Sequence, residues 1–178
     1  FRTENARDDI ARWRALGIDT YDPFDFERQA ATPEGDTVTV GFSLGFATSP
    51  EMPELAVFAC EQRAPEHFWK PAYQEHPNGA RDLAGVVLVA DDPARTAAFF
   101  GRLFGGAVEP VDGGASVACG QHRIEVLTPE ATRARDPGWN GEPGEGALAA
   151  GLLIRGEGDG RPVVPAAEAN GAFIQWSG

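Results

Sequence analysis

The 178-residue sequence has little positive charge and no long apolar run. Its 15 lysine and arginine residues, of which only Lys70 is a lysine, face 27 aspartate and glutamate residues, giving a formal net charge of −12. Such a chain repels phosphate backbones and anionic lipids, which argues against nucleic acid and membrane surfaces as partners. Its longest apolar run, "LAGVVLVA" from Leu83, is far shorter than the roughly 18 residues that a membrane-spanning helix needs. We therefore expect a soluble protein.

Cysteine is scarce as well. Cys60 and Cys119 are far apart, and each lies in an apolar strand pattern, where a free thiol behaves as a small buried hydrophobe. The sequence does not open with a signal peptide, so we expect free thiols in a reducing cytoplasm. It also lacks a phosphate-binding loop, a nucleophile elbow and a dinucleotide-binding fingerprint. The excess of arginine over lysine is typical of a GC-rich bacterial genome.

One supersecondary pattern repeats along the chain. Residues 83–129 predict the order β-α-β-β-β: the buried strand "LAGVVLVA", a helix opened by "DDP", and three short strands separated by glycine turns. Residues 1–64 predict the same order, with a helix that Asn5 caps and Gly17 ends. There the first strand is a stub at Phe1, so we interpret this copy as truncated at its N-terminal side. Repetition of one unit in a fixed order is a strong indication of fold.

Three further segments complete the organisation. Residues 147–178 predict a partial third copy in which the helix has shrunk to at most two turns. Residues 65–82 form a linker rich in aromatic residues and proline, which we interpret first as a tether between two units. Residues 130–146 are a glycine- and proline-rich linker without periodicity, and its Trp139 is the most exposed tryptophan candidate.

These motifs resemble a known family. The repeated β-α-β-β-β order, the "DDP" helix start and the closing strand "RIEVLTP" resemble the vicinal-oxygen-chelate superfamily of glyoxalases, bleomycin-resistance proteins and extradiol dioxygenases. "FWKPAYQEHPNGA" running into "LAGVVLVADDP" is similar to the glyoxalase-like domain branch. The resemblance implies an α+β fold in which tandem βαβββ units form curved mixed sheets, a half-barrel with helices outside, around a small-molecule cavity. Because open sheet edges are often completed by a second subunit, we also expect a homodimer.

The resemblance further implies a divalent metal (Zn, Ni, Mn or Fe) that grips neighbouring oxygens of a substrate, as in lyases, isomerases and dioxygenases. Its ligands would be a histidine from a first strand and a glutamate from a last strand. Glu125 and Glu61 match the glutamate position, but the first strands within the sequence contain no histidine. A metal-free protein that binds or sequesters a drug-like molecule is therefore an equal alternative, and a structural pseudo-enzyme used for dimerisation is a third.

Seven side chains are candidates to line the cavity. They come from strands of all three copies and from the aromatic linker: Phe42, Leu44, Phe58, His67, Trp69, His122 and Trp176. Along a strand, His122 should point away from the face that carries Glu125, because the two positions differ by an odd number of residues.

Overall fold

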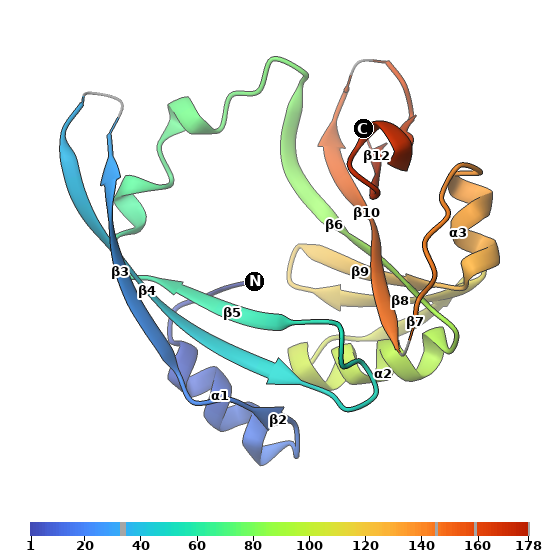
Figure 1. Cartoon of the computed structure of the whole chain (residues 1–178), viewed down its shortest axis with the longest axis horizontal. Coiled ribbons are helices and arrows are strands. Elements are labelled where there is room, and N and C mark those ends of the chain that lie inside the picture. Colours follow the sequence, from blue (N-terminus) through green and yellow to red (C-terminus); the bar gives the residue numbers. More distant parts are fainter. Residues whose placement is uncertain (33–34, 145, 159, 178) are drawn as a thin grey trace. The chain divides into compact units, whose positions relative to one another are not determined.

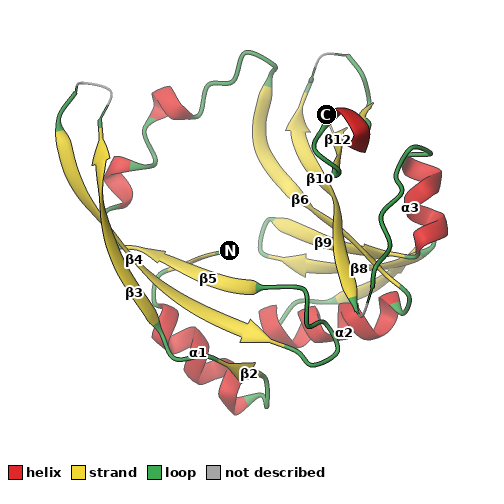
Figure 2. Ribbon diagram, in the orientation of Figure 1, coloured by secondary structure: helices red, strands yellow, loops and turns green. Residues whose placement is uncertain are grey.

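The computed structural model describes residues 1–32, 35–144, 146–158 and 160–177 (Figure 1). The chain divides into two compact units, Phe1–Gln74 and Glu75–Gly178, and the boundary lies within the aromatic linker. Each unit combines a mixed β-sheet with helices (Figure 2), so the α+β expectation is confirmed. None of the helices in the described ranges is long and apolar enough to cross a membrane.

In the first unit a helix packs on a five-stranded sheet. Its elements are β1 (Arg2–Thr3), α1 (Ala6–Ala15), β2 (Asp19–Thr20), β3 (Phe24–Ala31), β4 (Thr37–Thr48), β5 (Val57–Gln62), η1 (Pro65–His67) and η2 (Pro71–Tyr73). β1 runs parallel to β5, and β4 pairs antiparallel with β5, β3 and β2. The predicted order is therefore present, with β2 as a short addition.

The ends of α1 follow the sequence signals. The Asn5 side chain accepts hydrogen bonds from the backbone N–H groups of Arg7 and Asp8, at 3.0 and 3.2 Å. These bonds satisfy donors that have no partner inside the helix. Gly17, just beyond the helix, has φ +71, a left-handed conformation that glycine adopts without steric cost. Both predicted signals are confirmed.

One side of β4 is shaped to receive α1. A side chain at Gly45 would lie 3.0 Å from the carbonyl oxygen of Ala6 and 3.0 Å from Ile10 Cγ1, so the helix contacts the strand where the side chain is absent. Trp13, on the same helix, is fully buried. Residues that share the Gly45 side of the sheet therefore face α1, and their neighbours in sequence face away from it.

The second unit holds a seven-stranded sheet. Its elements are β6 (Ala80–Ala90), α2 (Pro93–Phe104), β7 (Val108–Val111), β8 (Gly114–Cys119), β9 (His122–Leu127), α3 (Pro129–Arg135), β10 (Ala147–Gly156), β11 (Val163–Val164), η3 (Ala166–Glu168) and β12 (Phe173–Ser177). β6 lies at the centre, parallel to β9 on one side and antiparallel to β10 on the other. The strands of residues 147–178, predicted as a partial third copy, thus lie in one sheet with those of the second copy. The short helix η3 occupies the place in the chain where the helix of that third copy was predicted.

The expectation of an irregular linker over residues 130–146 was wrong at its start. α3 begins after Thr128, whose hydroxyl accepts a hydrogen bond from the Ala131 N–H at 3.1 Å, and Pro129 takes the first helical position. Trp139 was also misjudged, because only 3% of it is exposed. It belongs to a core cluster in which β6, β9, β10 and β12 pack with η3 and α3. A short capped helix thus covers a face of this sheet.

Within this core, one glycine makes room for one aromatic ring. Gly151 of β10 is the register partner of Phe173 of β12, and a Cβ at Gly151 would lie 2.6 Å from the Phe173 ring. Phe173 itself is fully buried. The ring therefore fills the space that a side chain on the neighbouring strand would need.

We predict that Phe173→Ala lowers the free energy of unfolding by about 3–5 kcal/mol, because it leaves a cavity. Gly151→Ala alone should also destabilise, by overpacking. The double variant should be more stable than the sum of the two losses predicts, since the added methyl group enters the vacated space. Urea unfolding of the four proteins measures this coupling. Strict additivity would show that the two positions do not compete for space.

Candidate functional site

The face of the first sheet that points away from α1 is rich in aromatic side chains. Phe42, Leu44 and Phe46 alternate along β4 with the residues that face the helix. On β5, Phe58 is the register partner of Phe46, and Cys60 is that of Leu44. The structure therefore brings three sequence candidates, Phe42, Leu44 and Phe58, to one face.

Rings on this face contact one another in two groups. The Phe26 and Phe42 rings are stacked with centroids 4.9 Å apart, and Phe46 and Phe58 lie 5.3 Å apart. Phe42 is almost buried, whereas Phe58 is 40% exposed and Phe24 is 55% exposed. We call this surface the aromatic face, made by Phe24, Phe26, Phe42, Phe46 and Phe58. Clustered exposed apolar side chains of this kind are typical of a binding surface.

The linker after β5 adds to one end of the aromatic face. Phe68 packs on Phe42 with centroids 5.4 Å apart. The indole Nε1 of Trp69 donates a hydrogen bond to Gln62 Oε1 at 2.9 Å, and 49% of Trp69 is exposed. His67 is half-buried instead, with Nε2 3.7 Å from Glu66 Oε1. Sequence reasoning proposed His67 and Trp69, but the contact with the strand face is made by Phe68 and Trp69.

Two guanidinium groups lie over rings at this site. Arg2 Cζ is 5.5 Å from the centroid of Trp69, and Arg28 Cζ is 5.9 Å from that of Phe42. Both distances suit a cation–π interaction. Neither arginine stood out in the sequence, because the contacts depend on strand register.

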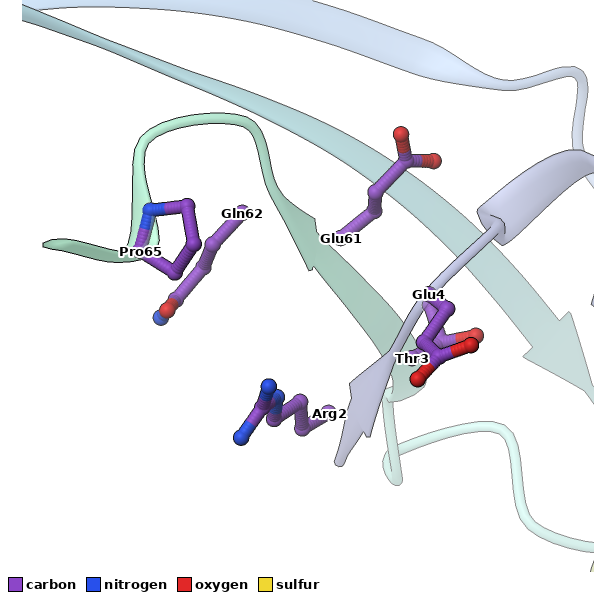
Figure 3. A pocket seen from close by; sticks show the side chains of 6 residues that line it. All are labelled: Arg2, Thr3, Glu4, Glu61, Gln62 and Pro65. Atoms are coloured by element: carbon purple, nitrogen blue, oxygen red, sulfur yellow. The ribbon is translucent and has the colours of Figure 1, made fainter. Parts of the chain in front are cut away.

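A hollow of about 220 Å³ opens at the ends of β1 and β5. Its lining residues are Arg2, Thr3, Glu4, Glu61, Gln62 and Pro65 (Figure 3). Arg2 and Gln62 project to one side of the strand pair, and Glu61 projects to the other. Five of its six lining residues have polar or charged side chains, and Arg2 also lies over the ring of Trp69.

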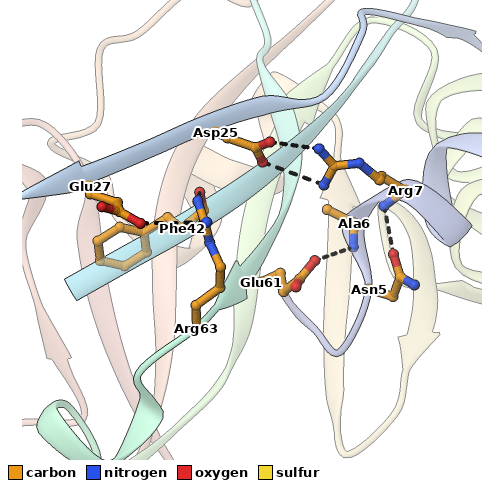
Figure 4. Close-up of polar contacts among 8 residues, drawn as sticks. All are labelled: Asn5, Ala6, Arg7, Asp25, Glu27, Phe42, Glu61 and Arg63. Carbon is orange, nitrogen blue, oxygen red and sulfur yellow. Dashed lines mark hydrogen bonds and ion pairs between the residues drawn. The ribbon is translucent and has the colours of Figure 1, made fainter. Parts of the chain in front are cut away.

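Glu61, a proposed metal ligand, lies on the α1 side of the sheet. Its Oε2 accepts a hydrogen bond from the Ala6 N–H at 3.0 Å, where the positive end of the helix dipole favours a carboxylate (Figure 4). Nearby, Arg7 Nη2 is 2.6 Å from Asp25 Oδ2, and this hydrogen bond holds the pKa of Asp25 below its ordinary value. Glu61 thus fixes the start of α1 and does not face the aromatic side chains.

Glu125, the other proposed ligand, is held by two arginines. It is 7% exposed, with Oε1 2.6 Å from Arg123 Nε and Oε2 2.5 Å from Arg135 Nη1. Burial by itself raises the pKa of Glu125, but the hydrogen bond from Arg123 and the ion pair with Arg135 outweigh it and bring the pKa below its ordinary value. Glu125 is therefore an ionised structural anchor that ties α3 to β9.

The remaining candidates, His122 and Trp176, belong to the second unit. His122 opens β9, with Nε2 3.8 Å from Asp82 Oδ1, and it faces away from Glu125 as its position indicated. The ring of Trp176 packs against Gly158, where a Cβ would lie 2.7 Å from the indole. Neither residue lies on the aromatic face of the first unit.

The described residues do not fit a divalent metal. Over residues 1–32, 35–144, 146–158 and 160–177, no three histidine, cysteine, aspartate or glutamate side chains come together as a possible metal site. A catalytic metal commonly takes three or more such donors. Glu125 already forms ion pairs with two guanidinium groups, and Glu61 accepts a hydrogen bond at the helix start.

The sequence profile of the glyoxalase-like domain matches residues 1–104, which is more than half of the chain. The chain belongs to the glyoxalase-like domain family. The resemblance to the glyoxalase-like domain branch is thereby confirmed. Among curated proteins, no sequence matches this glyoxalase-like chain.

Several solved structures are similar to this glyoxalase-like protein. A hypothetical protein from Staphylococcus aureus has a TM-score of 0.67 at 10% identity, over 99% of this chain and 63% of its own, so this chain spans less than two thirds of it. Methylmalonyl-CoA epimerase from Mycobacterium tuberculosis has a TM-score of 0.42 at 13% identity, over 60% of this chain and 93% of its own. A xylose isomerase-like TIM barrel/4-hydroxyphenylpyruvate dioxygenase fusion protein has a TM-score of 0.45 at 17% identity, over 87% of this chain and 24% of its own. The first likeness shows a shared fold and says nothing about activity.

We predict that Glu125→Gln destabilises the protein by about 2 kcal/mol at pH 7, because two arginines lose a charged partner. Since the folded-state pKa lies below the ordinary value of 4.5, this contribution is present above pH 4.5 and is lost as the pH falls through the folded-state pKa. Urea unfolding of the variant and the wild type at several pH values measures the difference. Glu109→Gln, at an exposed position of β7, is the matched control. An equal loss for both variants would contradict the anchoring role.

Proposed function

We propose that this glyoxalase-like protein binds a small planar molecule on the aromatic face of its first unit, and that Glu61 and Glu125 hold no metal there. The observation that carries the proposal is the presence of two groups of contacting rings on one face of the sheet. Phe24, Phe26 and Phe42 form the first group, and Phe46 and Phe58 form the second. Phe42 is buried, whereas Phe24 and Phe58 stay about half exposed. A flat apolar ligand would cover ring surface that is otherwise in contact with water.

Ring stacking favours a planar ligand over an aliphatic one. Aromatic pairs in offset or edge contact contribute about 0.5–1.5 kcal/mol each beyond the burial of their area. The rings of Phe24, Phe26 and Phe42 are linked by centroid distances of 5.6 and 4.9 Å, so they give a ready-made platform. Little ordering is then needed on binding, because the platform exists before the ligand arrives.

The chemistry of the face supports binding more than catalysis. Cys60 is the reactive side chain on it, and burial raises the pKa of the Cys60 thiol. A protonated thiol is a weak nucleophile. Sequestration of the ligand therefore agrees with the site better than a metal-dependent lyase, isomerase or dioxygenase reaction does.

The test is calorimetric titration of the full chain with 1-naphthamide, a neutral planar probe. We predict that Phe24→Ala and Phe58→Ala each weaken binding about tenfold, since each removes one ring contact. Leu16→Ala is the matched control, because Leu16 is 47% exposed at the end of α1, away from this face. Equal affinity for all four proteins, or no binding at all, would contradict the proposal.

Elemental analysis of the same purified protein tests whether it binds a divalent metal. We expect no stoichiometric divalent metal that depends on Glu61 or Glu125, and unchanged naphthamide binding in Glu61→Gln. A metal present at one per chain and lost in Glu125→Gln would instead favour the metal-dependent enzyme.

A further inference from the structure

We infer that the ligand of the aromatic face is an aromatic carboxylate, whose anionic group is recognised by Arg2 and Arg28. This inference rests on the proposed function and adds the charge of the ligand. Among the residues that the structure describes, Arg2 and Arg28 have no ion-pair partner, although the protein is acidic.

Arg2 and Arg28 are joined to the aromatic face by a continuous row of side chains. Arg28 lies over the ring of Phe42, and Phe42 is the register partner of Gln62. Gln62 accepts the hydrogen bond from Trp69, and Trp69 lies beneath Arg2. Arg28 therefore lies at the platform on which a ring would stack, and Arg2 lies on the same face of the sheet, over the ring of Trp69.

The other arginines of the strand and helix surfaces in this unit bind acids. Arg7 pairs with Asp25 at 2.6 Å, and Arg14 pairs with Asp22 at 3.0 Å. Arg12 pairs with Asp9, and Arg63 lies 3.7 Å from Glu27. Within the described residues, Arg2 and Arg28 make no ion pair.

This difference follows from the strand register. Asp25 and Glu27 lie opposite Ser43 and Gly41, on the α1 side of the sheet, whereas Arg28 lies opposite Val40 on the other side. Glu61 likewise lies on the α1 side, away from Arg2. These three acids are thus on the helix side, and Arg2 and Arg28 bring positive charge to the aromatic face although the whole chain has a net charge of −12.

A carboxylate suits these two groups chemically. A guanidinium group presents parallel N–H donors that match the two oxygens of a carboxylate, and such charge-assisted bonds are about twice as strong as neutral ones. An arginine that is packed on a ring is already oriented, so less side-chain freedom is lost on binding. The ring of the ligand would stack on the phenylalanines while its carboxylate meets one of the arginines at the rim.

The experiment compares 1-naphthoate with 1-naphthamide, two probes of the same shape that differ in charge. By calorimetry on the full chain at low salt, we expect naphthoate to bind about tenfold or more tightly than naphthamide. Arg2→Gln or Arg28→Gln should remove most of this difference between the two probes, and circular dichroism of each variant shows that it is folded. Arg102→Gln, an exposed change on α2 with the same loss of charge, should leave both affinities unaltered.

Each contrary result has a separate meaning. Equal affinity for the two probes would overturn the carboxylate inference and leave the proposed function standing. A preference for naphthoate that survives both arginine substitutions, or that Arg102→Gln removes equally, would also overturn it. Binding of neither probe would overturn the proposed function itself.

Discussion

The alternation of side chains along β4 is the constraint on which the first unit depends. Gly45 lies on the side that receives α1, where a side chain would meet Ala6 and Ile10, and Phe42 and Phe46 lie on the other side. Side chains alternate strictly along a strand. When a small residue faces the helix, its two neighbours in sequence therefore face the opposite side of the sheet. A slip of one residue would press phenylalanine rings against α1 and leave the glycines facing solvent.

The same alternation separates charges. Acids on the α1 side meet the start of the helix or an arginine, as Glu61 and Asp25 do. Arginines on the other side meet rings, as Arg2 and Arg28 do. A strongly acidic chain thereby keeps a cationic, apolar surface. The net charge of a protein therefore says little about the charge of one of its faces.

The second unit uses the same repeat in a different way. Its sheet carries α2 against β8 and β9, and the face that bears Glu125 is covered by α3 and by residues such as Trp139 and Phe173. Glu125 stands at the position that the family resemblance gives to a metal ligand, yet Arg123 and Arg135 take both of its oxygens. Like a metal ion, the two guanidinium groups bring positive charge to a buried carboxylate. Unlike a metal ion, they offer no open coordination position to which a substrate could bind.

Local signals were sufficient for most of the elements. The Asn5 cap, the Gly17 stop, the "DDP" helix start and the alternation of β4 involve neighbours in sequence, whose conformational preferences act at short range. α3 was overlooked although its signal, Thr128 followed by Pro129, was present, because the surrounding glycines and prolines favoured a loop. The prediction that Trp139 is exposed was wrong because burial of a side chain depends on the rest of the fold, here on the core of the second unit.

The sequence by itself determined the repeat, the family, and the shared strand side of Phe42 and Leu44. Only the tertiary structure decided which side of the sheet each glutamate takes and what it meets, because Arg135 reaches Glu125 from a helix and Ala6 reaches Glu61 across 55 positions of the chain. Only it showed Arg28 over the ring of Phe42. Such pairings depend on strand register and helix placement, and many weak contacts summed over the whole unit fix both of these.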